Sequence, residues 1–226
     1  MNQPVLGIIG GGQLGSMLSE AAKKIDIKTV VLSDDPDAPA KNFANKFIYG
    51  NYDDSKIITE FVDSVDLVTY EFENIPFDIL NEINKSKSVL PKPEINSLIQ
   101  NRLTEKDFLN NNNIRTTNYA LIKNKEEIKE NENLLPGLIK TTTLGYDGKG
   151  QYKLNSLNDI NEGIDFTKEY ILEKFINLKK EISVVICRFG NQKYEIYEPI
   201  ENVHEDQILK HSKIPAEISD SINVKT

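Results

Sequence analysis

The most informative stretch of the sequence is the run Lys140-Thr141-Thr142-Thr143-Leu144-Gly145-Tyr146-Asp147-Gly148-Lys149-Gly150-Gln151. It joins a lysine at the end of a predicted strand to a glycine-rich loop that carries a second lysine and an acid. Glycines let such a backbone bend around a polyphosphate, and the ammonium groups of Lys140 and Lys149 can offset charge that builds up as a phosphoryl group moves. A mobile hairpin loop is the alternative. The convergence of these residues between two strand-like runs favours a phosphate-binding loop.

A second glycine-rich segment, Gly10-Gly11-Gly12-Gln13-Leu14-Gly15, lies between a predicted strand and a predicted helix. Its N–H groups could approach a phosphate at the helix N-terminus. Asp34 and Asp35 end the next strand, where a dinucleotide-binding fold places an acid against a ribose, so an NAD(P)-linked enzyme is one alternative. A tight turn that needs glycine only for its backbone conformation is another. This motif alone does not decide between them.

The first hundred residues alternate β-rich runs with amphipathic segments, which predicts an open α/β domain with a parallel sheet. The expected strands are Val5–Ile9, Thr29–Leu32, Phe47–Tyr49, Leu67–Tyr70 and Val89–Leu90, and the expected helices are Leu14–Ile25, Ser55–Ser64 and Phe77–Asn84. Pro91-Lys92-Pro93 interrupts this rhythm, and a helix over Arg102–Asn110 follows. We therefore expect two domains, residues 1–99 and 100–226. The second reads as α+β, with strands at Leu138–Lys140, Gln151–Leu154, Tyr170–Glu173, Ile182–Arg188 and Tyr194–Tyr197.

Composition narrows the class of protein. Apolar residues make up 38% of the 226 residues and charged residues 27%, as in ordinary soluble domains, and no apolar run is long enough to span a membrane. The formal charge of −8 argues against a nucleic-acid partner. A single cysteine, Cys187, excludes an internal disulfide, and only two histidines make a zinc site difficult to build. The start of the chain lacks the pattern of an export signal, so we expect a cytoplasmic protein.

Four segments occur in a characteristic order: the glycine turn with Gln13-Leu14-Gly15, then Tyr70-Glu71-Phe72-Glu73-Asn74-Ile75-Pro76, Arg102-Leu103-Thr104-Glu105-Lys106, and Gly145 to Gln151. Together they resemble the 5-(carboxyamino)imidazole ribonucleotide synthase family of ATP-grasp ligases in purine biosynthesis. The resemblance implies a Rossmann-like N-terminal domain followed by a partial ATP-grasp domain. It also implies carboxylation of aminoimidazole ribonucleotide with ATP and bicarbonate, giving ADP and phosphate. The formate-using transformylase of the same pathway shares this fold and remains an alternative.

The resemblance further implies a nucleotide site. Arg102 and Lys140 would reach the phosphates of ATP, Glu181 would hold the ribose hydroxyls, and His204 would lie near the nucleotide. An ordinary surface role for Glu181 or His204 stays open. The phosphate-covering loop would comprise Gly145, Tyr146, Asp147, Gly148, Lys149, Gly150 and Gln151, and the strand edge facing adenine would comprise Glu173, Lys174, Phe175 and Ile176.

For the second substrate, the resemblance places its phosphate at the glycine turn, at Gly12, Gln13 and Leu14. Glu73 and Asn74 would form a substrate-side wall, although Glu71 is an equally acidic neighbour. The catalytic candidates are Tyr146, which would stack on the ring, Asp147, which would orient or deprotonate the amine, and Lys149, which would neutralise an oxyanion.

The sequence departs from the family at two anion contacts, since Thr141–Thr143 and Ser16 stand where relatives commonly carry arginine. A hydroxyl can donate one hydrogen bond to a phosphate but lacks the charge and fork of a guanidinium. Family members also continue well past the position of Thr226, and that part carries acidic Mg²⁺ ligands. We therefore expect ATP and Mg²⁺ as cofactors with no metal ligand in this chain, a homodimer for the full-length protein, and negligible ligase activity for this chain alone.

Overall fold

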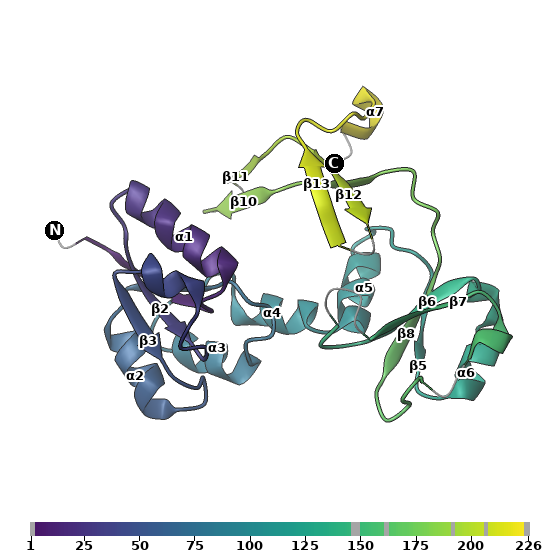
Figure 1. Ribbon diagram of the computed structural model, residues 1–226, viewed down its shortest axis with the longest axis horizontal. Helices are drawn as coiled ribbons and strands as arrows, with labels where there is room; N and C mark the ends of the chain where they lie inside the picture. Colours follow the sequence, from purple (N-terminus) through teal and green to yellow (C-terminus); the bar gives the residue numbers. More distant parts are fainter. Residues whose placement is uncertain (1–2, 146–149, 161–162, 191–192, 206–207, 224–226) are drawn as a thin grey trace. The chain divides into compact units, whose positions relative to one another are not determined.

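The computed structural model describes residues 3–145, 150–160, 163–190, 193–205 and 208–223. The chain divides into two compact units, Met1–Thr116 and Thr117–Thr226 (Figure 1). No helix among the described residues combines the length and apolar character needed to cross a membrane.

The first unit is built on a parallel four-stranded sheet. Its order is β3 (Lys46–Tyr49), β2 (Lys28–Ser33), β1 (Val5–Ile9) and β4 (Leu67–Tyr70). The accompanying helices are α1 (Gln13–Lys24), α2 (Ser55–Asp63), α3 (Phe77–Asn84), α4 (Pro93–Ile99) and α5 (Arg102–Asn111), with a 3₁₀ turn, η1, at Pro39–Asn42. The prediction of a parallel α/β sheet is therefore confirmed for these strands.

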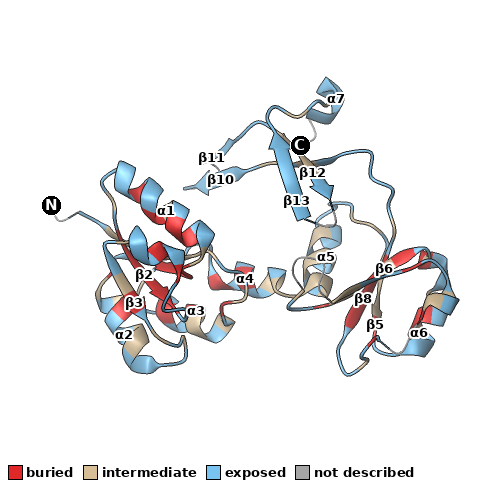
Figure 2. Cartoon of the chain, in the orientation of Figure 1, coloured by how far each residue is buried: buried red, intermediate tan, exposed pale blue. Residues whose placement is uncertain are grey.

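Both faces of this sheet are covered. Ile9 and Val30 belong to the core on the side of α2 and α3, where Phe61 is fully buried. Ile8 and Val31 pack on the opposite side with Leu18 of α1. Strands buried on both faces read as continuous apolar runs, which is why β1 and β2 show little alternation. Figure 2 shows the buried residues concentrated in these strands and on the inner sides of the helices.

Local signals fix the helix starts. Asp54 caps α2 by accepting a hydrogen bond from the N–H of Lys56, and Asn101 caps α5 by accepting from Leu103 and Thr104. Such caps satisfy N–H groups that have no partner within the helix. The start of α5 places Arg102 at its first position.

The second unit contains an antiparallel sheet with the order β5 (Tyr119–Ile122), β8 (Tyr170–Lys174), β6 (Gly137–Thr141) and β7 (Gln151–Leu154). Helix α6 (Lys125–Glu130) contributes Ile128 to the core on one face, where Ile139 and Leu172 are fully buried. Successive strand residues face opposite sides. The neighbouring residues Lys140 and Glu173 therefore lie on the other face of the sheet. Two 3₁₀ turns, η2 (Glu132–Leu134) and η3 (Leu157–Asp159), complete this part.

The remaining strands form two smaller sheets. One has the order β13 (Ile208–Lys213), β12 (Ile200–Glu205) and β9 (Glu181–Ser183), and the other pairs β10 (Ile186–Phe189) with β11 (Lys193–Ile196). A short helix, α7 (Asp220–Asn223), follows. Strands β10, β11 and β13 are exposed along their described lengths (Figure 2).

Two strand predictions were wrong. The run Ile182–Arg188 is not one strand, because it divides into β9 and β10, which belong to different sheets. Val89–Leu90 is not a strand either, since Val89 makes only an isolated parallel bridge to Val68. The other predicted strands and helices are present within one or two residues at each end.

Candidate functional site

The glycine turn between β1 and α1 is held by the carboxylate of Glu71, the residue that follows β4. The N–H of Gly12 donates a hydrogen bond to Oε1 of Glu71 at 2.9 Å. Gly10 has a φ of 101°, and a Cβ there would lie 2.8 Å from Cγ of Glu71. A Cβ at Gly15 would lie 2.6 Å from the carbonyl oxygen of Gly10. The turn therefore requires glycine for both its backbone conformation and its close contacts.

The predicted substrate residues of this turn lie at the start of α1. Gln13 and Leu14 are exposed in its first turn, and α1 has no side-chain cap. Ser16 is buried, and its hydroxyl donates to the carbonyl of Gln13 at 2.7 Å. This bond uses the only proton of the Ser16 hydroxyl. In this structure Ser16 therefore cannot donate to an anion in place of an arginine.

The two acids that the sequence left as equal candidates differ in their surroundings. Glu71 reaches the glycine turn, whereas Glu73 is exposed and accepts a hydrogen bond from the side chain of its neighbour Asn74 at 3.2 Å. The amide of Gln100 donates to the carbonyl of Glu73 at 2.7 Å and anchors that segment. The sequence left Glu71 and Glu73 as equally acidic candidates, and the contact with Gly12 distinguishes Glu71.

The acids that could have contacted a dinucleotide ribose make local contacts. Oδ1 of Asp34 accepts a hydrogen bond from the hydroxyl of Tyr52 at 3.3 Å, and Oδ1 of Asp35 accepts from the N–H of Asp37 at 2.9 Å. Burial and then the charge of Asp34 raise the pKa of Tyr52 to about 12. The phenol therefore stays protonated and bound to Asp34 at neutral pH.

In the second unit, two predicted nucleotide residues form an ion pair. Nζ of Lys140 on β6 lies 2.8 Å from Oε2 of Glu173 on β8, and the side chains are only 20% and 10% exposed. Lys140 pairs with Ile171 in the sheet register and Leu138 pairs with Glu173, which makes the lysine and the acid diagonal neighbours on one face. Gln151, also predicted for the site, pairs with Lys140 across β7.

The predicted adenine edge begins with Glu173 at the end of β8 and continues to Ile176. The N–H of Lys174 donates to the carbonyl of Asn118 at 2.8 Å, and the N–H of Phe175 donates to that of Pro136 at 2.9 Å. The carbonyl of Lys174 accepts from the hydroxyl of Thr117 at 2.8 Å. A carbonyl has a second lone pair, so this one can still accept from a ligand.

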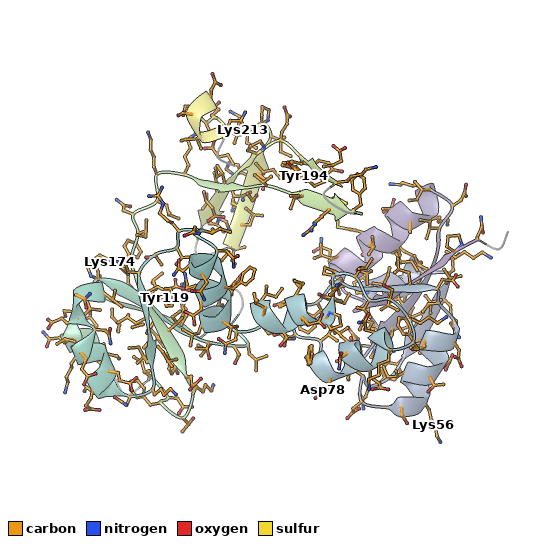
Figure 3. All side chains as sticks on the ribbon, turned by 180° about the vertical axis from the view of Figure 1, so that it is seen from behind. Lys56, Asp78, Tyr119, Lys174, Tyr194 and Lys213 are labelled. Carbon is orange, nitrogen blue, oxygen red and sulfur yellow. The ribbon has the colours of Figure 1, made fainter. Side chains whose placement is uncertain are left out.

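Two further contacts shape this edge. Nζ of Lys174, labelled in Figure 3, donates to the carbonyl of Asn133 at 3.0 Å. Nζ of Lys153 lies 4.4 Å from the centre of the Phe175 ring, within cation–π range. Ile176 is 52% exposed, and its N–H has no hydrogen-bond partner among the residues that the structure describes. The edge thus presents a donor and an acceptor two residues apart.

The predicted ribose residue and the predicted histidine are neighbours. Nδ1 of His204 lies 3.4 Å from Oε1 of Glu181, on the adjacent antiparallel strands β12 and β9. The side chains are 34% and 45% exposed. Both can therefore still meet a ligand.

Only part of the glycine-rich loop can be compared with its prediction. Gly150 has a φ of 70°, and its carbonyl accepts from the N–H of Thr141 at 3.0 Å. Thr142 is buried, and its hydroxyl lies 3.4 Å from the carbonyl of Glu169, so it does not take the role of the missing arginine. Gly145 is described and half-buried. The predicted residues Tyr146, Asp147, Gly148 and Lys149 lie outside the described residues.

Arg102, the remaining predicted phosphate contact, opens α5 in the first unit, where it is half-buried. The predicted residues are therefore divided between the units. Gly12, Gln13, Leu14, Glu73, Asn74 and Arg102 belong to the first, and Lys140, Gly145, Gly150, Gln151, Glu173, Lys174, Phe175, Ile176, Glu181 and His204 belong to the second.

Comparison with known families agrees with this division. The ribonucleotide synthetase preATP-grasp domain matches residues 3–100, and the ATP-grasp domain matches residues 107–226. The chain belongs to the ATP-grasp family. The compact units divide slightly later, between residues 116 and 117, so the first includes α5.

Individual ATP-grasp relatives cover nearly the whole chain. The N5-carboxyaminoimidazole ribonucleotide synthase of Brucella melitensis is 39% identical over 220 residues, covering 95% of this chain and 61% of that protein. A crystal structure of the Staphylococcus aureus N5-carboxyaminoimidazole synthetase with ADP has a TM-score of 0.92 at 35% identity, covering 98% of this chain and 61% of that one. The synthase from Aspergillus clavatus, solved with ADP and 5-aminoimidazole ribonucleotide, has a TM-score of 0.88 at 27% identity, covering 99% and 60%. The chain thus spans about 60% of the length of these relatives.

The described residues of this ATP-grasp chain offer no metal centre. No group of three or more His, Cys, Asp or Glu side chains among them is arranged to hold a metal ion.

Proposed function

We propose that this chain carries the nucleotide site and part of the substrate site of an ATP-dependent carbon–nitrogen ligase. The reaction is carboxylation of 5-aminoimidazole ribonucleotide with bicarbonate, giving N5-carboxyaminoimidazole ribonucleotide, ADP and phosphate. The observation that carries this proposal is the alignment with the Brucella melitensis synthase, which runs through both units at 39% identity. The chemistry of the individual residues agrees with it.

The nucleotide would bind on the polar face and edge of the β5–β8–β6–β7 sheet. Lys140 would contact the phosphates, joined by Arg102 and by the loop from Gly145 to Gln151. The exposed N–H of Ile176 and the carbonyl of Lys174 offer adenine one donor and one acceptor, which matches the ring nitrogen and the amino group on its edge. Glu181 would accept hydrogen bonds from the ribose hydroxyls, with His204 beside it.

The ribonucleotide would bind at the glycine turn of the first unit. Because Gly12 donates to Glu71, the N–H groups of Gln13 and Leu14 at the start of α1 would be the ones to meet its phosphate. Glu73, which is exposed, and Asn74, which is half-buried, would form the wall of this site.

Phosphorylation of bicarbonate by ATP would produce carboxyphosphate and ADP. The carboxyl group then passes to the exocyclic amine, either directly or as carbon dioxide released in the site, and phosphate is released. Asp147 would orient the amine or accept its proton, Lys149 would neutralise the oxyanion, and Tyr146 would stack on the imidazole. These three assignments rest on the family resemblance alone.

Several finer features belong to the same proposal. We infer that the first unit is Rossmann-like, because its parallel order β3-β2-β1-β4 matches the first four strands of the doubly wound order and its glycine turn joins β1 to α1. We also propose domain limits at residues 1–99 and 100–226, a cytoplasmic location and a homodimer for the full-length protein. Mg²⁺ would accompany ATP with ligands outside the described residues.

The alternatives are an NAD(P)-linked enzyme, a formate-dependent transformylase, and a nucleotide-binding module without turnover. The first is disfavoured because the ATP-grasp domain matches residues 107–226 and the Brucella melitensis synthase aligns with 95% of the chain. An NAD(P)-linked enzyme also does not need the phosphate-binding segment from Lys140 to Gln151.

The deciding experiment measures phosphate release by a full-length form, with ATP and with bicarbonate or formate as the second substrate. The matching acceptor, 5-aminoimidazole ribonucleotide, is supplied with bicarbonate, and the glycinamide ribonucleotide is supplied with formate. We expect release that requires bicarbonate and the aminoimidazole. Release only with formate would identify the transformylase, and ATP binding without release would identify the binding module.

A further inference from the structure

The buried ion pair of the second unit places two charges where stability alone does not require them. Lys140 and Glu173 are 20% and 10% exposed, whereas the nearby pair Lys123–Glu169 is 55% and 51% exposed. Removing two charges from water costs about as much as their attraction returns, and apolar residues of similar size are often as stabilising. Folding stability alone therefore does not account for this pair.

The geometry of the pair leaves the lysine available to a ligand. One N–H of the Lys140 ammonium donates to Oε2 of Glu173 at 2.8 Å. An ammonium has three donors, so two remain for other acceptors. The bond also fixes a four-carbon side chain that would otherwise lose rotamer freedom when it binds a phosphate.

We propose that the Glu173 side chain is a positioning residue that holds the Lys140 ammonium in place for the phosphates of the nucleotide. This inference rests on the proposed nucleotide site. The end of β8 would then have two functions. The Glu173 carboxylate would hold the lysine, and the backbone of the residues that follow it would bind the adenine base. Glu173 pairs with Leu138 in the sheet register, so it lies diagonally across from Lys140 on the same face of the sheet.

Two electrostatic effects of Glu173 oppose each other. Its negative charge repels a polyphosphate, which would weaken nucleotide binding. Its hydrogen bond holds the ammonium of a lysine that is mostly withdrawn from water and offsets the cost of burying that charge. Because the Lys140 side chain is only 20% exposed and its partner lies 2.8 Å away, we expect the second effect to outweigh the first.

The test compares ADP with adenosine, because only the diphosphate can use Lys140. Isothermal titration of the chain gives the ratio of the two dissociation constants for the wild type, Glu173→Gln, Lys140→Met and the double variant. We expect Glu173→Gln to reduce the preference for ADP about tenfold or more, as for loss of a hydrogen bond to a charged group, and to leave adenosine binding unchanged. In the Lys140→Met background, the second substitution should change neither ligand's affinity.

Each other result contradicts the inference in a distinguishable way. An equal loss of ADP and adenosine affinity in Glu173→Gln would show a structural role, and tighter ADP binding would show that the carboxylate competes for the lysine. A wild type without preference for ADP over adenosine would overturn the proposed nucleotide site, and the inference with it. A preserved preference in Glu173→Gln overturns the inference alone.

Two controls keep the result interpretable. Glu169→Gln removes the exposed ion pair of the same unit and should change neither affinity. If Glu173→Gln does not fold, side-chain NMR of Lys140 in the wild type decides instead. Its Nζ protons should be protected from exchange relative to those of Lys123, and equal exchange would contradict the inference.

Discussion

The N–H of Gly12 and the carboxylate of Glu71 meet at 2.9 Å across 59 residues of sequence. The bond ties the turn after β1 to the end of β4, two strands that are neighbours in the parallel sheet. A carboxylate at the N-terminus of a helix is favoured by the unpaired N–H groups and by the helix dipole. Glu71 thus supplies an internal anion at the turn where the sequence suggested only an external one.

Replacing Glu71 should destabilise the first unit, because the N–H of Gly12 loses its hydrogen-bond acceptor. We expect Glu71→Ala to lower the free energy of unfolding by about 1 to 3 kcal/mol, because it leaves the part-buried N–H of Gly12 without its partner. Glu71→Gln keeps an acceptor oxygen and should cost less. Urea denaturation measures both, and Glu73→Ala, at an exposed acid two residues away, should stay within about 0.5 kcal/mol of the wild type. Equal effects at the two positions would contradict this account.

A side chain at Gly10 should be more costly than one at a glycine with free space. Gly10→Ala adds a Cβ 2.8 Å from Glu71 to a residue with φ 101°. Gly190 also has a positive φ, 60°, but has no atom within 4 Å of its Cβ position among the described residues. We expect Gly190→Ala to cost about 1 to 2 kcal/mol and Gly10→Ala distinctly more. Amide hydrogen exchange, read separately in each unit, would measure the two losses, and a smaller loss at Gly10 would refute the close contact.

Much of the first unit could be predicted from local sequence. The strand Val5–Ile9 and the helix Phe77–Asn84 have the expected bounds, because apolar runs and amphipathic periodicity follow directly from burial. Val89–Leu90 has the composition of a strand, but Val89 finds only an isolated bridge. The pattern of apolar residues indicates which residues are buried. It does not indicate how many residues of a segment will pair with a neighbouring strand.

The second unit was harder to predict because its contacts depend on register. Ile182–Arg188 is rich in β-forming residues, yet its two halves pair in different sheets. Strands β12 and β13, which carry several charged residues, give little apolar alternation and were not predicted.

The site shows the same limit. Lys140 and Glu173 were both expected near the nucleotide, but their contact follows from the pairing of Leu138 with Glu173, which no local pattern reports. Glu71 and Glu73 have the same chemistry at neighbouring positions, and only the fold separates them.

The positive charge of Lys140 should support ATP use by contacting the phosphates. In a full-length form, we expect Lys140→Ala to weaken ATP use by about tenfold or more and Lys140→Arg to weaken it far less, because the guanidinium keeps the positive charge. Steady-state phosphate release gives the comparison, with Lys123→Ala as an exposed lysine control. Unchanged release in Lys140→Ala would remove this residue from the site.

Asp147 should separate nucleotide binding from chemistry. In the full-length form, Asp147→Asn should keep its affinity for ATP and lose most carboxylation, because an amide of the same shape cannot accept a proton from the amine. Binding of ATP and formation of carboxylated product are measured on the same preparation. An equal loss of nucleotide affinity would make Asp147 an ATP contact or a structural residue.

Tyr52 should give the stability of the first unit a measurable dependence on alkaline pH. Burial and the charge of Asp34 raise its pKa in the folded protein to about 12, whereas a tyrosine in an unfolded chain ionises near pH 10. Above pH 10 the unfolded chain has lost this proton while the folded one retains it. The contribution of Tyr52 to stability is therefore complete below pH 10 and is lost as the pH rises through about 12. The slope from this one group is at most about 1.4 kcal/mol per pH unit.

Tyr52→Phe keeps the ring but removes both the titrating hydroxyl and its hydrogen bond to Asp34. Below pH 9 its free energy of unfolding should differ from that of the wild type by an amount that does not change with pH. Between pH 10 and 12 the wild type should lose stability more steeply than the variant, so the two curves converge. Chemical denaturation across this range measures both curves. Parallel curves would mean that the Tyr52 hydroxyl titrates alike in the folded and unfolded chain, and that burial beside Asp34 does not hold its proton.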